Sequence, residues 1–193
     1  MIKINNLTKK YKDKLAVDNL NLEIKTGELF SLLGTNGAGK TTTIKMLSTL
    51  ILPTSGEVEI NNLDLVKDSS KIKEIINISP QETAVASNLT VLENLYFMAG
   101  IYQIPNKEDK IKELIKLFKL EEVLKQKAKT LSGGYQRKLS IAISLINNPK
   151  ILFLDEPTLG LDVISRHDLW KVIEALKGKT TIILTTHYME EAE

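Results

Sequence analysis

The residues best suited to chemistry form a glycine-rich segment, GTNGAGKT, which runs from Gly34 to Thr41. It fits the pattern G-x-x-x-x-G-K-[S/T], and it lies between a short apolar run at 28–33 and residues with helical spacing. In such a loop the glycines allow backbone amides to approach a phosphate group closely. Lys40 would bring a positive charge to the outer phosphates and Thr41 a hydroxyl ligand to Mg²⁺. The segment predicts a nucleotide phosphate site rather than an ordinary glycine-rich turn.

Two adjacent carboxylates, Asp155 and Glu156, follow a continuous apolar run at 151–154. Such a run is typical of a strand buried on both faces of a parallel sheet, and open α/β sheets bind ligands beyond the carboxyl ends of their strands. Because neighbouring residues of a strand point in opposite directions, the two carboxylates can have different functions. We expect Asp155 to hold Mg²⁺, directly or through water, and Glu156 to accept a proton from an attacking water. The alternative is that Asp-Glu-Pro merely ends the strand before a turn.

His187 follows another apolar segment, 180–185, so it lies at the same edge of the predicted sheet. A single histidine is usually structural or merely exposed. Its place at the carboxyl end of a strand instead favours a hydrogen bond to the γ-phosphate or to the attacking water. Gln81 comes directly after Ser79-Pro80, and its local sequence indicates only a turn.

The tetrapeptide Asn106–Asp109 resembles the N-K-x-D element with which GTPases bind guanine. No buried strand precedes it, however, and apolar residues at helical spacing follow it. We therefore expect Asn106 to be the N-cap of an amphipathic helix, with Glu108 and Asp109 complementing the helix dipole.

A second segment, LSGGYQRKLSIAISLI at 131–146, opens with Ser132 and two glycines and continues as an amphipathic helix. Ser132 is a suitable N-cap, and an open helix start with glycines is itself a site for an anion. The alternative is a simple capped helix. Because the chain already has one phosphate loop, we expect this second site to serve a nucleotide held by another copy of the protein.

The remaining pattern predicts an α/β fold that places these segments at the ends of strands. Alternating or continuous apolar residues indicate strands, and apolar residues at three- and four-residue spacing indicate helices. Their alternation predicts βαβ crossovers and a doubly wound parallel sheet. The predicted strands cover 15–24, 28–33, 57–60, 151–154 and 180–185, and the predicted helices follow Lys40 and Ser132 and cover 91–101, 111–118 and 165–176.

Composition excludes several classes of protein. The chain has 193 residues with 42% hydrophobic content, which suits one globular domain. Its 26 Lys and Arg residues balance 24 Asp and Glu, so the net charge of +2 does not indicate a nucleic-acid partner. No apolar run approaches the roughly 18 residues of a membrane span. Neither a signal peptide nor a cysteine is present, and these features indicate a cytoplasmic protein.

Together these motifs resemble those of the nucleotide-binding subunit of ATP-binding cassette (ABC) transporters. GTNGAGKT is similar to the family's phosphate loop, ILFLDEP to its metal and base strand, and LSGGYQ to its signature. Gln81 is similar to the glutamine of its Q-loop, Leu161-Asp162 to part of the loop after the base, and His187 to its switch histidine. The order and spacing agree over nearly the whole chain, which makes the combination far more specific than any single motif.

The resemblance implies a P-loop NTPase fold of the RecA-like type, with a parallel sheet core, an antiparallel β subdomain and an inserted helical subdomain. The core would cover 1–84 and 147–193, and the helical subdomain with the signature would cover 85–146. Relatives continue beyond the position of Glu193, so we expect this single ABC ATPase domain to be truncated at its C-terminus. The loop after the base departs from the family, because Gly160 replaces the serine or alanine of many relatives.

The resemblance also implies which residues bind Mg-ATP. Tyr11 would stack on adenine, although packing alone is the alternative explanation for an aromatic residue there. Gln81 would approach Mg²⁺ together with Thr41 and Asp155, and it would link the site to a membrane partner. The residues that would wrap the phosphates are Gly34, Thr35, Asn36, Gly37, Ala38, Gly39, Lys40, Thr41 and Thr42.

A second group of residues would act in hydrolysis and between two subunits. Glu156 would be the catalytic base, His187 a second catalytic residue, and Asp162 would organise the dimer contact. Two ATP molecules would join two subunits until hydrolysis releases them. The signature residues that would face the γ-phosphate held by the opposite subunit are Ser132, Gly133, Gly134 and Gln136.

The resemblance therefore implies an ATPase that powers transport across a membrane without entering it. Its partners would be a second ABC subunit and an integral membrane permease, contacted near 81–90 and by the helical insert at the cytoplasmic face. Three segments, NLTVLENLYFMAGIY, LSGGYQRKLSIAISLI and DEPTLGLDVISR, are most similar to the exporter branch that pairs with ABC-2 type permeases. One alternative is a soluble ABC ATPase acting on DNA or ribosomes, although such proteins usually carry paired cassettes or long coiled-coil insertions. Another is a small-molecule kinase, against which the signature argues.

Overall fold

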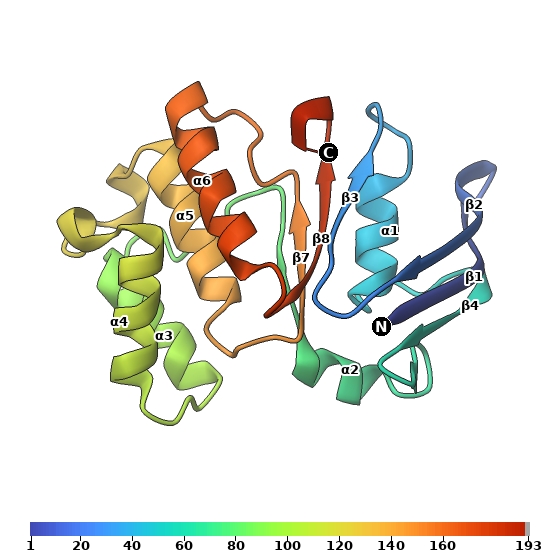
Figure 1. Ribbon diagram of the computed structural model, residues 1–193, viewed down its shortest axis with the longest axis horizontal. Helices are drawn as coiled ribbons and strands as arrows, with labels where there is room; N and C mark the ends of the chain where they lie inside the picture. The colour runs from blue at the N-terminus through green and yellow to red at the C-terminus, as the bar shows by residue number, and fades with distance from the viewer. Residues whose placement is uncertain (192–193) are drawn as a thin grey trace.

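The fold is built on two β-sheets (Figure 1). The computed structural model describes residues 1–191. The central sheet is parallel, with strand order β3-β8-β7-β6, and an antiparallel sheet with order β2-β1-β4-β5 lies beside it. This arrangement confirms the predicted α/β fold with a parallel core and an antiparallel β subdomain. The strands are β1 (Ile2–Tyr11), β2 (Lys14–Ile24), β3 (Leu29–Leu33), β4 (Ser55–Ile60), β5 (Leu63–Asp64), β6 (Ile76–Ser79), β7 (Ile151–Asp155) and β8 (Thr181–Thr186).

Every residue of β7 and β8, the two central strands of the parallel sheet, is buried. This burial confirms that the apolar runs after 150 and 180 are strands covered on both faces. Strand β6 is not predicted by its sequence, because INIS is short and half polar. It pairs with β7 at the edge of the sheet and leads the chain directly toward Gln81.

Helices cover both faces of the parallel sheet, with α1 on one face and α5 and α6 on the other (Figure 1). The helices α3, α4 and α5 lie within the residues 85–146 that the sequence predicts as a helical insert, and α6 is the crossover between β7 and β8. No helix within residues 1–191 is long and apolar enough to cross a membrane. The helices are α1 (Lys40–Leu47), α2 (Ser69–Ile75), α3 (Val91–Ile101), α4 (Lys107–Phe118), α5 (Gly133–Ser144) and α6 (Val163–Leu176), with short 3₁₀ turns at Glu121–Val123, Ala128–Thr130 and Met189–Glu191.

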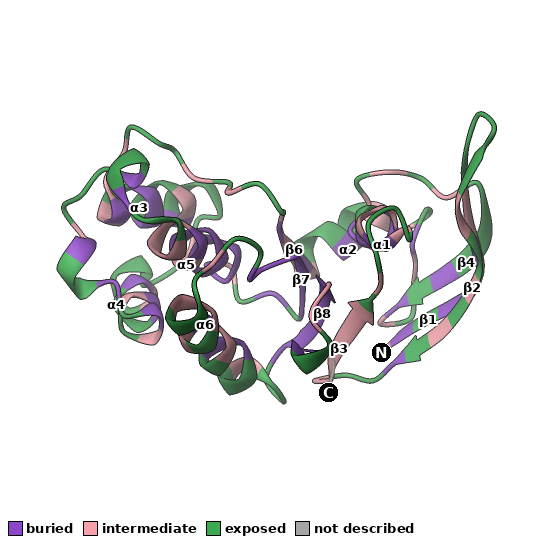
Figure 2. Ribbon diagram, turned by 90° about the horizontal axis from the view of Figure 1, so that it is seen from above, coloured by how far each residue is buried: buried purple, intermediate pink, exposed green. Residues whose placement is uncertain are grey.

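Alternate side chains of β7 divide the hydrophobic interior in two. Leu152 and Leu154 belong to a cluster formed with the helices α3 to α6, whereas Ile151 and Phe153 belong to a cluster with α1 and the antiparallel sheet. β8 alternates in the same way, with Ile183 on the second side. Figure 2 shows the buried residues of these strands between the two layers. The strands β7 and β8 therefore separate two hydrophobic cores. Packing against both cores fixes the carboxyl ends of these strands in place.

The segment Asn106–Asp109 begins α4, as its helical interpretation predicts. Asn106 occupies the N-cap position, but the prediction that its side chain caps the helix is wrong. Its backbone is left-handed, with φ 53°, and its side chain makes no capping hydrogen bond. Asparagine suits the position because it adopts this conformation more readily than most residues. Glu108 and Asp109 do lie in the first turn, where they complement the dipole.

Candidate nucleotide site

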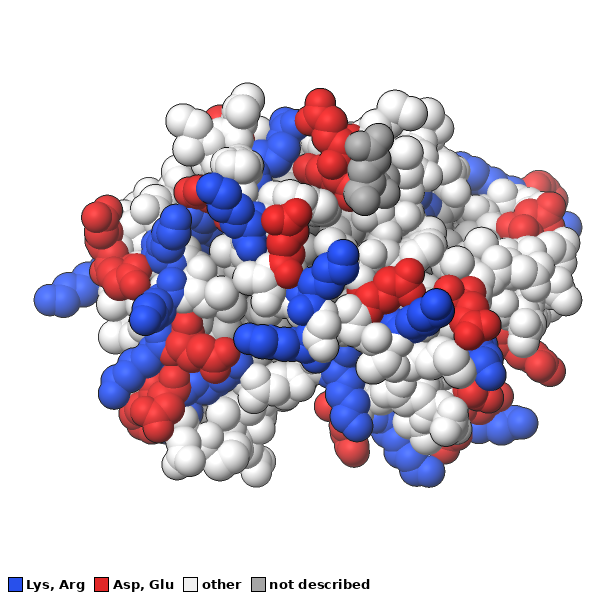
Figure 3. All heavy atoms as spheres, in the orientation of Figure 1, with Lys and Arg blue, Asp and Glu red and all other residues white. Residues whose placement is uncertain are grey.

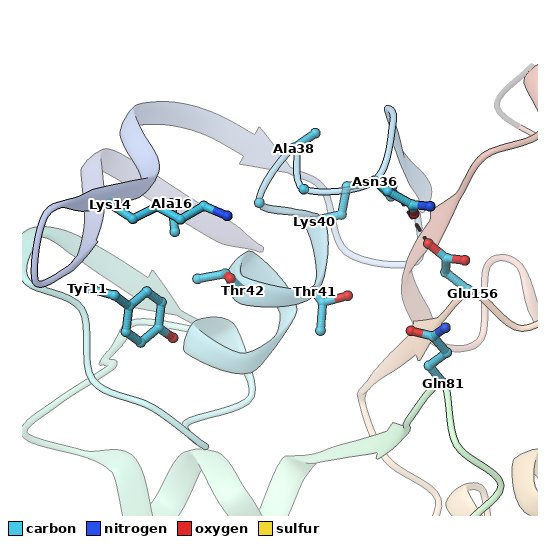
Figure 4. Close-up of a pocket in the computed structure, with 12 residues that line it drawn as sticks. Tyr11, Lys14, Ala16, Asn36, Ala38, Lys40, Thr41, Thr42, Gln81 and Glu156 are labelled. Atoms are coloured by element: carbon cyan, nitrogen blue, oxygen red, sulfur yellow. Dashed lines mark ion pairs between the residues drawn. The ribbon is translucent and has the colours of Figure 1, made fainter.

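A cleft of about 230 Å³ opens where the glycine-rich loop meets the ends of the strands. Figure 4 shows Tyr11 at one end of this cleft and Gln81 and Glu156 at the other. Its size and polar lining suit a phosphate-bearing ligand better than an apolar one. Most of the predicted nucleotide residues line it, and the lining consists of Tyr11, Lys14, Ala16, Gln81, Glu156 and the loop residues 36–42.

The glycine-rich loop is held in its shape by the neighbouring antiparallel sheet. Gly39 has φ 85°, and a Cβ there would lie 2.3 Å from the carbonyl oxygen of Ala16. Only glycine fits this approach, and the loop therefore rests directly on β2. Helix α1 begins immediately afterwards, and no side chain caps its first amides. Those amides and the positive end of the helix dipole are available to an anion in the cleft.

The ammonium group of Lys40 lies in the middle of the site. Its Nζ donates to the carbonyl oxygens of Gly34, at 2.6 Å, and Thr35, at 3.1 Å, and it lies 3.6 Å from Glu156 Oε1. Figure 4 marks this ion pair with a dashed line. The Lys40 side chain is 7% exposed, so its charge acts in a poorly solvated environment, where it attracts a phosphate strongly.

The residues that fit Mg²⁺ are joined by hydrogen bonds at the end of β7. Thr41 Oγ1 donates to Asp155 Oδ1 at 3.0 Å, and Thr185 Oγ1 of β8 donates to the same oxygen at 2.7 Å. A hydroxyl and a carboxylate are the oxygen ligands that Mg²⁺ prefers, and this ion usually takes few protein ligands besides phosphate and water. Within the described residues no group of three or more acidic or histidine side chains could hold a metal unaided. The donor set therefore fits a Mg²⁺ that arrives with a nucleotide.

Glu156 adopts an unusual backbone conformation that explains how it reaches the cleft. The prediction that Asp155 and Glu156 differ by alternation along one strand is wrong, because β7 ends at Asp155 and Glu156 has φ 49°. A left-handed conformation of this kind is costly outside glycine and persists only where neighbours hold it. Here the amide of Glu156 donates to Thr185 Oγ1 at 2.9 Å. The turn directs the carboxylate toward Lys40 and His187.

His187 lies between the glycine-rich loop and Glu156. Its Nδ1 is 2.9 Å from the carbonyl oxygen of Gly34, and its Nε2 is 2.5 Å from Glu156 Oε1. Lys40 Nζ lies 3.3 Å from the same Nδ1, so this nitrogen lies between a carbonyl oxygen and an ammonium group. The prediction that His187 lies at the same edge as the carboxylates is confirmed.

Tyr11 lies at the tip of the β1–β2 hairpin, paired with Lys14 across the turn. Its side chain is 46% exposed, and Lys9 Nζ lies 5.0 Å from the centre of its ring. Packing alone does not account for this residue, because the ring is not part of either core. It lines the mouth of the cleft, within reach of a planar group bound there.

The signature residues lie outside the cleft of their own chain. Ser132 caps α5 by accepting from the amide of Tyr135, which confirms its predicted N-cap role. Gln136 donates to the carbonyl oxygen of Leu131 at 3.1 Å, so its side chain closes the first turn. None of the residues 132–136 is among those that line the cleft. The signature therefore lies apart from the glycine-rich loop within one chain.

Asp162 lies beside the signature and caps α6. Its Oδ1 accepts from the amides of Ile164 and Ser165, and its Oδ2 accepts from Ser165 Oγ at 2.6 Å. These hydrogen bonds, above all those from Ser165, lower the pKa of Asp162. A Cβ on Gly134 would lie 2.8 Å from the same Ser165 Oγ. Gly134 is thus required by a contact inside the chain, which the sequence does not reveal.

This contact predicts different effects for the two signature glycines. Gly134→Ala should lower the free energy of unfolding by roughly 1–3 kcal/mol, because Ser165 must move and weaken its bond to Asp162. Gly133→Ala is the matched control, since no atom lies within 4 Å of its added Cβ. Urea unfolding of both variants measures the difference. In a Ser165→Gly background, which lacks the opposing side chain, Gly134→Ala should cost little further stability, and equal stability of the two alanine variants would contradict the contact.

The sequence misses two polar groups that shape the site. One is Arg137 of α5, which is buried, and the other is Thr185, whose hydroxyl donates to Asp155 and accepts from the amide of Glu156. Thr185 could have been identified as a hydroxyl at the end of a buried strand, close to His187. Arg137 carries no such signal, because an arginine in an amphipathic helix is normally exposed.

The fold and the cleft define the class of this protein. The class is that of a P-loop NTPase: a G-x-x-x-x-G-K-[S/T] loop joins β3 to α1 in a parallel sheet, and an aspartate at the end of β7, separated from β3 by β8, is bonded to the loop threonine. The sequence profile of the ABC transporter family matches residues 17–159, more than half of the chain. The chain therefore belongs to the ABC transporter family and is an ATPase cassette of that family.

Relatives and solved structures agree with this assignment. The chain is 42% identical over 198 residues to the phospholipid-transporting ATPase ABCA3 of Homo sapiens, and 39% identical over 196 residues to the probable multidrug ABC transporter ATP-binding protein YbhF of Escherichia coli. All of the chain is covered in both comparisons, but it spans only 12% and 34% of those proteins. The dimeric ATP-binding cassette MJ0796, bound to ADP and Pi, matches with a TM-score of 0.87 and 32% identity over 100% of this chain and 90% of that one.

Proposed function

We propose that this cassette binds and hydrolyses Mg-ATP as one half of a head-to-tail dimer and thereby drives a separate membrane permease. One observation carries the proposal. The glycine-rich loop and Glu156 line one cleft, and Asp155 is bonded to Thr41 of that loop, while none of the signature residues 132–136 lines the cleft. A signature that cannot reach its own nucleotide is explained if it completes the site of a second copy.

In this proposal the residues of the cleft divide the work of binding. Tyr11 stacks on adenine, and the loop 34–42 with Lys40 holds the phosphates. Thr41, Asp155 and Gln81 would hold Mg²⁺, which neutralises charge on the phosphate oxygens when it is bound. The support lies in the 3.0 Å bond between Thr41 and Asp155 and in the position of Gln81 on the cleft wall.

Glu156 and His187 perform the chemistry in this proposal. A water molecule attacks the γ-phosphorus, the bond from that phosphorus to the β–γ bridging oxygen breaks, and ADP and inorganic phosphate leave. Glu156 accepts the proton of the attacking water through its carboxylate. His187 orients that carboxylate through its 2.5 Å contact and stays anchored to the loop by its bond to Gly34.

The dimer in this proposal places Ser132, Gly133, Gly134 and Gln136 against the γ-phosphate held by the partner, with Asp162 at the contact. The dimeric state described for MJ0796 with ADP and Pi supports the arrangement. The exposed apolar side chains beside Asp162 support it too, since Val163 and Ile164 are 78% and 77% exposed. Such side chains commonly mark a contact surface.

The membrane partner is proposed to dock on the segment 81–90 and on α3. Phe97, Tyr96 and Tyr102 expose aromatic surface on that helix, which suits a protein interface. Positive and negative side chains are mixed on the face drawn in Figure 3, so a nucleic-acid backbone would find no continuous basic path there. The names of ABCA3, a phospholipid-transporting ATPase, and YbhF, a probable multidrug ABC transporter ATP-binding protein, support a role in transport, and we propose that this role is export at the cytoplasmic face of a membrane. Within the cassette, 1–84 and 147–193 would form the core and 85–146 the helical subdomain.

The proposal is tested by ATP hydrolysis and by capture of the partner. Phosphate release from the full chain should require Mg²⁺ and should rise more than linearly with protein concentration, because the active species is a dimer. Affinity capture of the intact protein from solubilised membranes should retain an integral membrane protein. Capture of ribosomes or DNA instead would favour the soluble alternative. Phosphate transfer to an acceptor other than water would favour a kinase.

A further inference from the structure

Arg137 connects the signature helix to the two sides of the nucleotide cleft. It lies in α5, little more than one turn after Ser132, and only 5% of its surface is exposed. Its Nη1 donates to the carbonyl oxygen of Pro80 at 2.7 Å, and its Nη2 donates to that of Gln81 at 2.6 Å. The second nitrogen also donates to the carbonyl oxygen of Glu156 at 3.3 Å.

A buried guanidinium is an unusual way to satisfy three carbonyl oxygens. No carboxylate lies within 4.0 Å of Arg137 among the described residues, so backbone carbonyls are its partners at close range. Burial lowers the pKa of Arg137, and the negative charge of Asp155 opposes that shift. Arginine nevertheless stays charged in proteins, and its planar fork can bond two chain segments at once. The Arg137 side chain therefore joins the segment at Pro80 and Gln81 to Glu156 by charged hydrogen bonds, beyond any contribution to packing.

Two of the three carbonyl groups that Arg137 binds belong to residues that line the cleft, Gln81 and Glu156. Gln81 follows β6, Glu156 follows β7, and these strands are paired neighbours. The Glu156 turn is held on one side by Thr185 of β8 and on the other by Arg137 of α5. Because the left-handed backbone of Glu156 is strained, the position of its carboxylate depends on both of these hydrogen bonds.

We infer that Arg137 is a positioning residue that couples the signature helix to Gln81 and Glu156 of the same chain. When the start of α5 meets the partner's nucleotide, a small movement of the helix shifts both carbonyl groups, and so both side chains in the chain's own cleft. Hydrolysis at one site then responds to occupancy of the other. This inference rests on the proposed function, since it requires the signature to contact a partner's nucleotide.

The test compares Arg137→Lys and Arg137→Gln with a substitution of a neighbouring lysine. Lys138→Gln is the matched control, because Lys138 lies on the same helix but its ammonium group contacts Asp168, at 3.7 Å, and the Tyr135 ring rather than the residues of the cleft. With the full chain we expect Arg137→Gln to lower kcat by roughly 10- to 100-fold and to leave the Kd for ATP within about threefold of wild type. Its Hill coefficient for ATP should fall toward 1. Arg137→Lys, which can reach only some of the carbonyls, should recover part of kcat, and Lys138→Gln should match wild type.

The outcomes separate this inference from the proposed function. If wild type hydrolyses ATP and Glu156→Gln does not, but the folded Arg137 variants keep wild-type kcat and cooperativity, the inference alone is wrong. Parallel losses of ATP affinity, kcat and thermal stability would mean that Arg137 is merely structural, and would also overturn it. If Arg137→Gln fails to fold, Arg137→Lys provides the test. A lower kcat with an unchanged Kd for ATP would support the inference. A wild type without hydrolysis or dimerisation instead overturns the proposed function.

Discussion

Replacing Glu156 by glutamine is expected to lower ATP hydrolysis by about 10²- to 10⁴-fold while ATP binding remains. Glutamine has nearly the same shape as glutamate, so it can keep the strained turn and the bonds of its backbone to Thr185 and Arg137. It cannot accept a proton from water at neutral pH. The loss corresponds to about 3–5 kcal/mol of transition-state stabilisation.

The same variant should gain rather than lose affinity for ATP. Glu156 Oε1 lies 3.6 Å from Lys40 Nζ, so removing the carboxylate charge leaves the ammonium group freer to bind phosphate. Size-exclusion chromatography with Mg-ATP should therefore show a persistent dimer. Glu59→Gln is the control, because Glu59 is exposed, does not line the cleft and lies outside the segment proposed to bind the membrane partner. Full turnover by Glu156→Gln would show that another group is the base.

A second large effect is expected from Ser132→Arg, which should abolish ATP-dependent dimerisation and reduce hydrolysis to the level of a monomer. Ser132 is exposed and lies outside the cleft, so the monomer should bind ATP as before. The added side chain would fill the space proposed for the partner's γ-phosphate. Light scattering with ATP measures the dimer, and the fluorescence of a labelled nucleotide measures binding.

Two further substitutions at this position distinguish steric exclusion from loss of the helix cap. Ser132→Asp keeps an oxygen that can cap α5, but it places a negative charge against the partner's phosphate, so it should also prevent closure. Ser132→Thr keeps both the cap and neutrality and should retain most activity. Normal turnover by both the arginine and the aspartate variants would rule out a site shared between two copies.

The sequence predicts those parts of the site whose chemistry depends on local spacing. The phosphate loop, the buried strand before Asp155 and the capped helix after Ser132 all follow from residue types within a few positions. The structure brings Asp155, Glu156 and His187 to one edge because parallel strands end together. Their placement was predictable, since the apolar runs before them could be recognised.

The remaining features depend on contacts between distant segments. Arg137 binds carbonyl oxygens of Pro80, Gln81 and Glu156, and a backbone carbonyl leaves no trace in the sequence. The left-handed turn at Glu156 is likewise imposed by tertiary hydrogen bonds, against its intrinsic preference. Gly134 could be predicted as a phosphate contact but not as a neighbour of Ser165.

The division of the interior by β7 and β8 has a consequence for how the molecule unfolds. Each of the two strands contributes apolar side chains to both clusters. Unfolding of either the helical part or the antiparallel part would therefore expose one face of these strands to water. The helical and antiparallel parts should therefore lose their structure in one cooperative transition, despite having separate interiors. Amide hydrogen exchange should therefore be slowest in β7 and β8. The residues of the candidate nucleotide site at the ends of these strands would then be attached to the part of the chain that opens last.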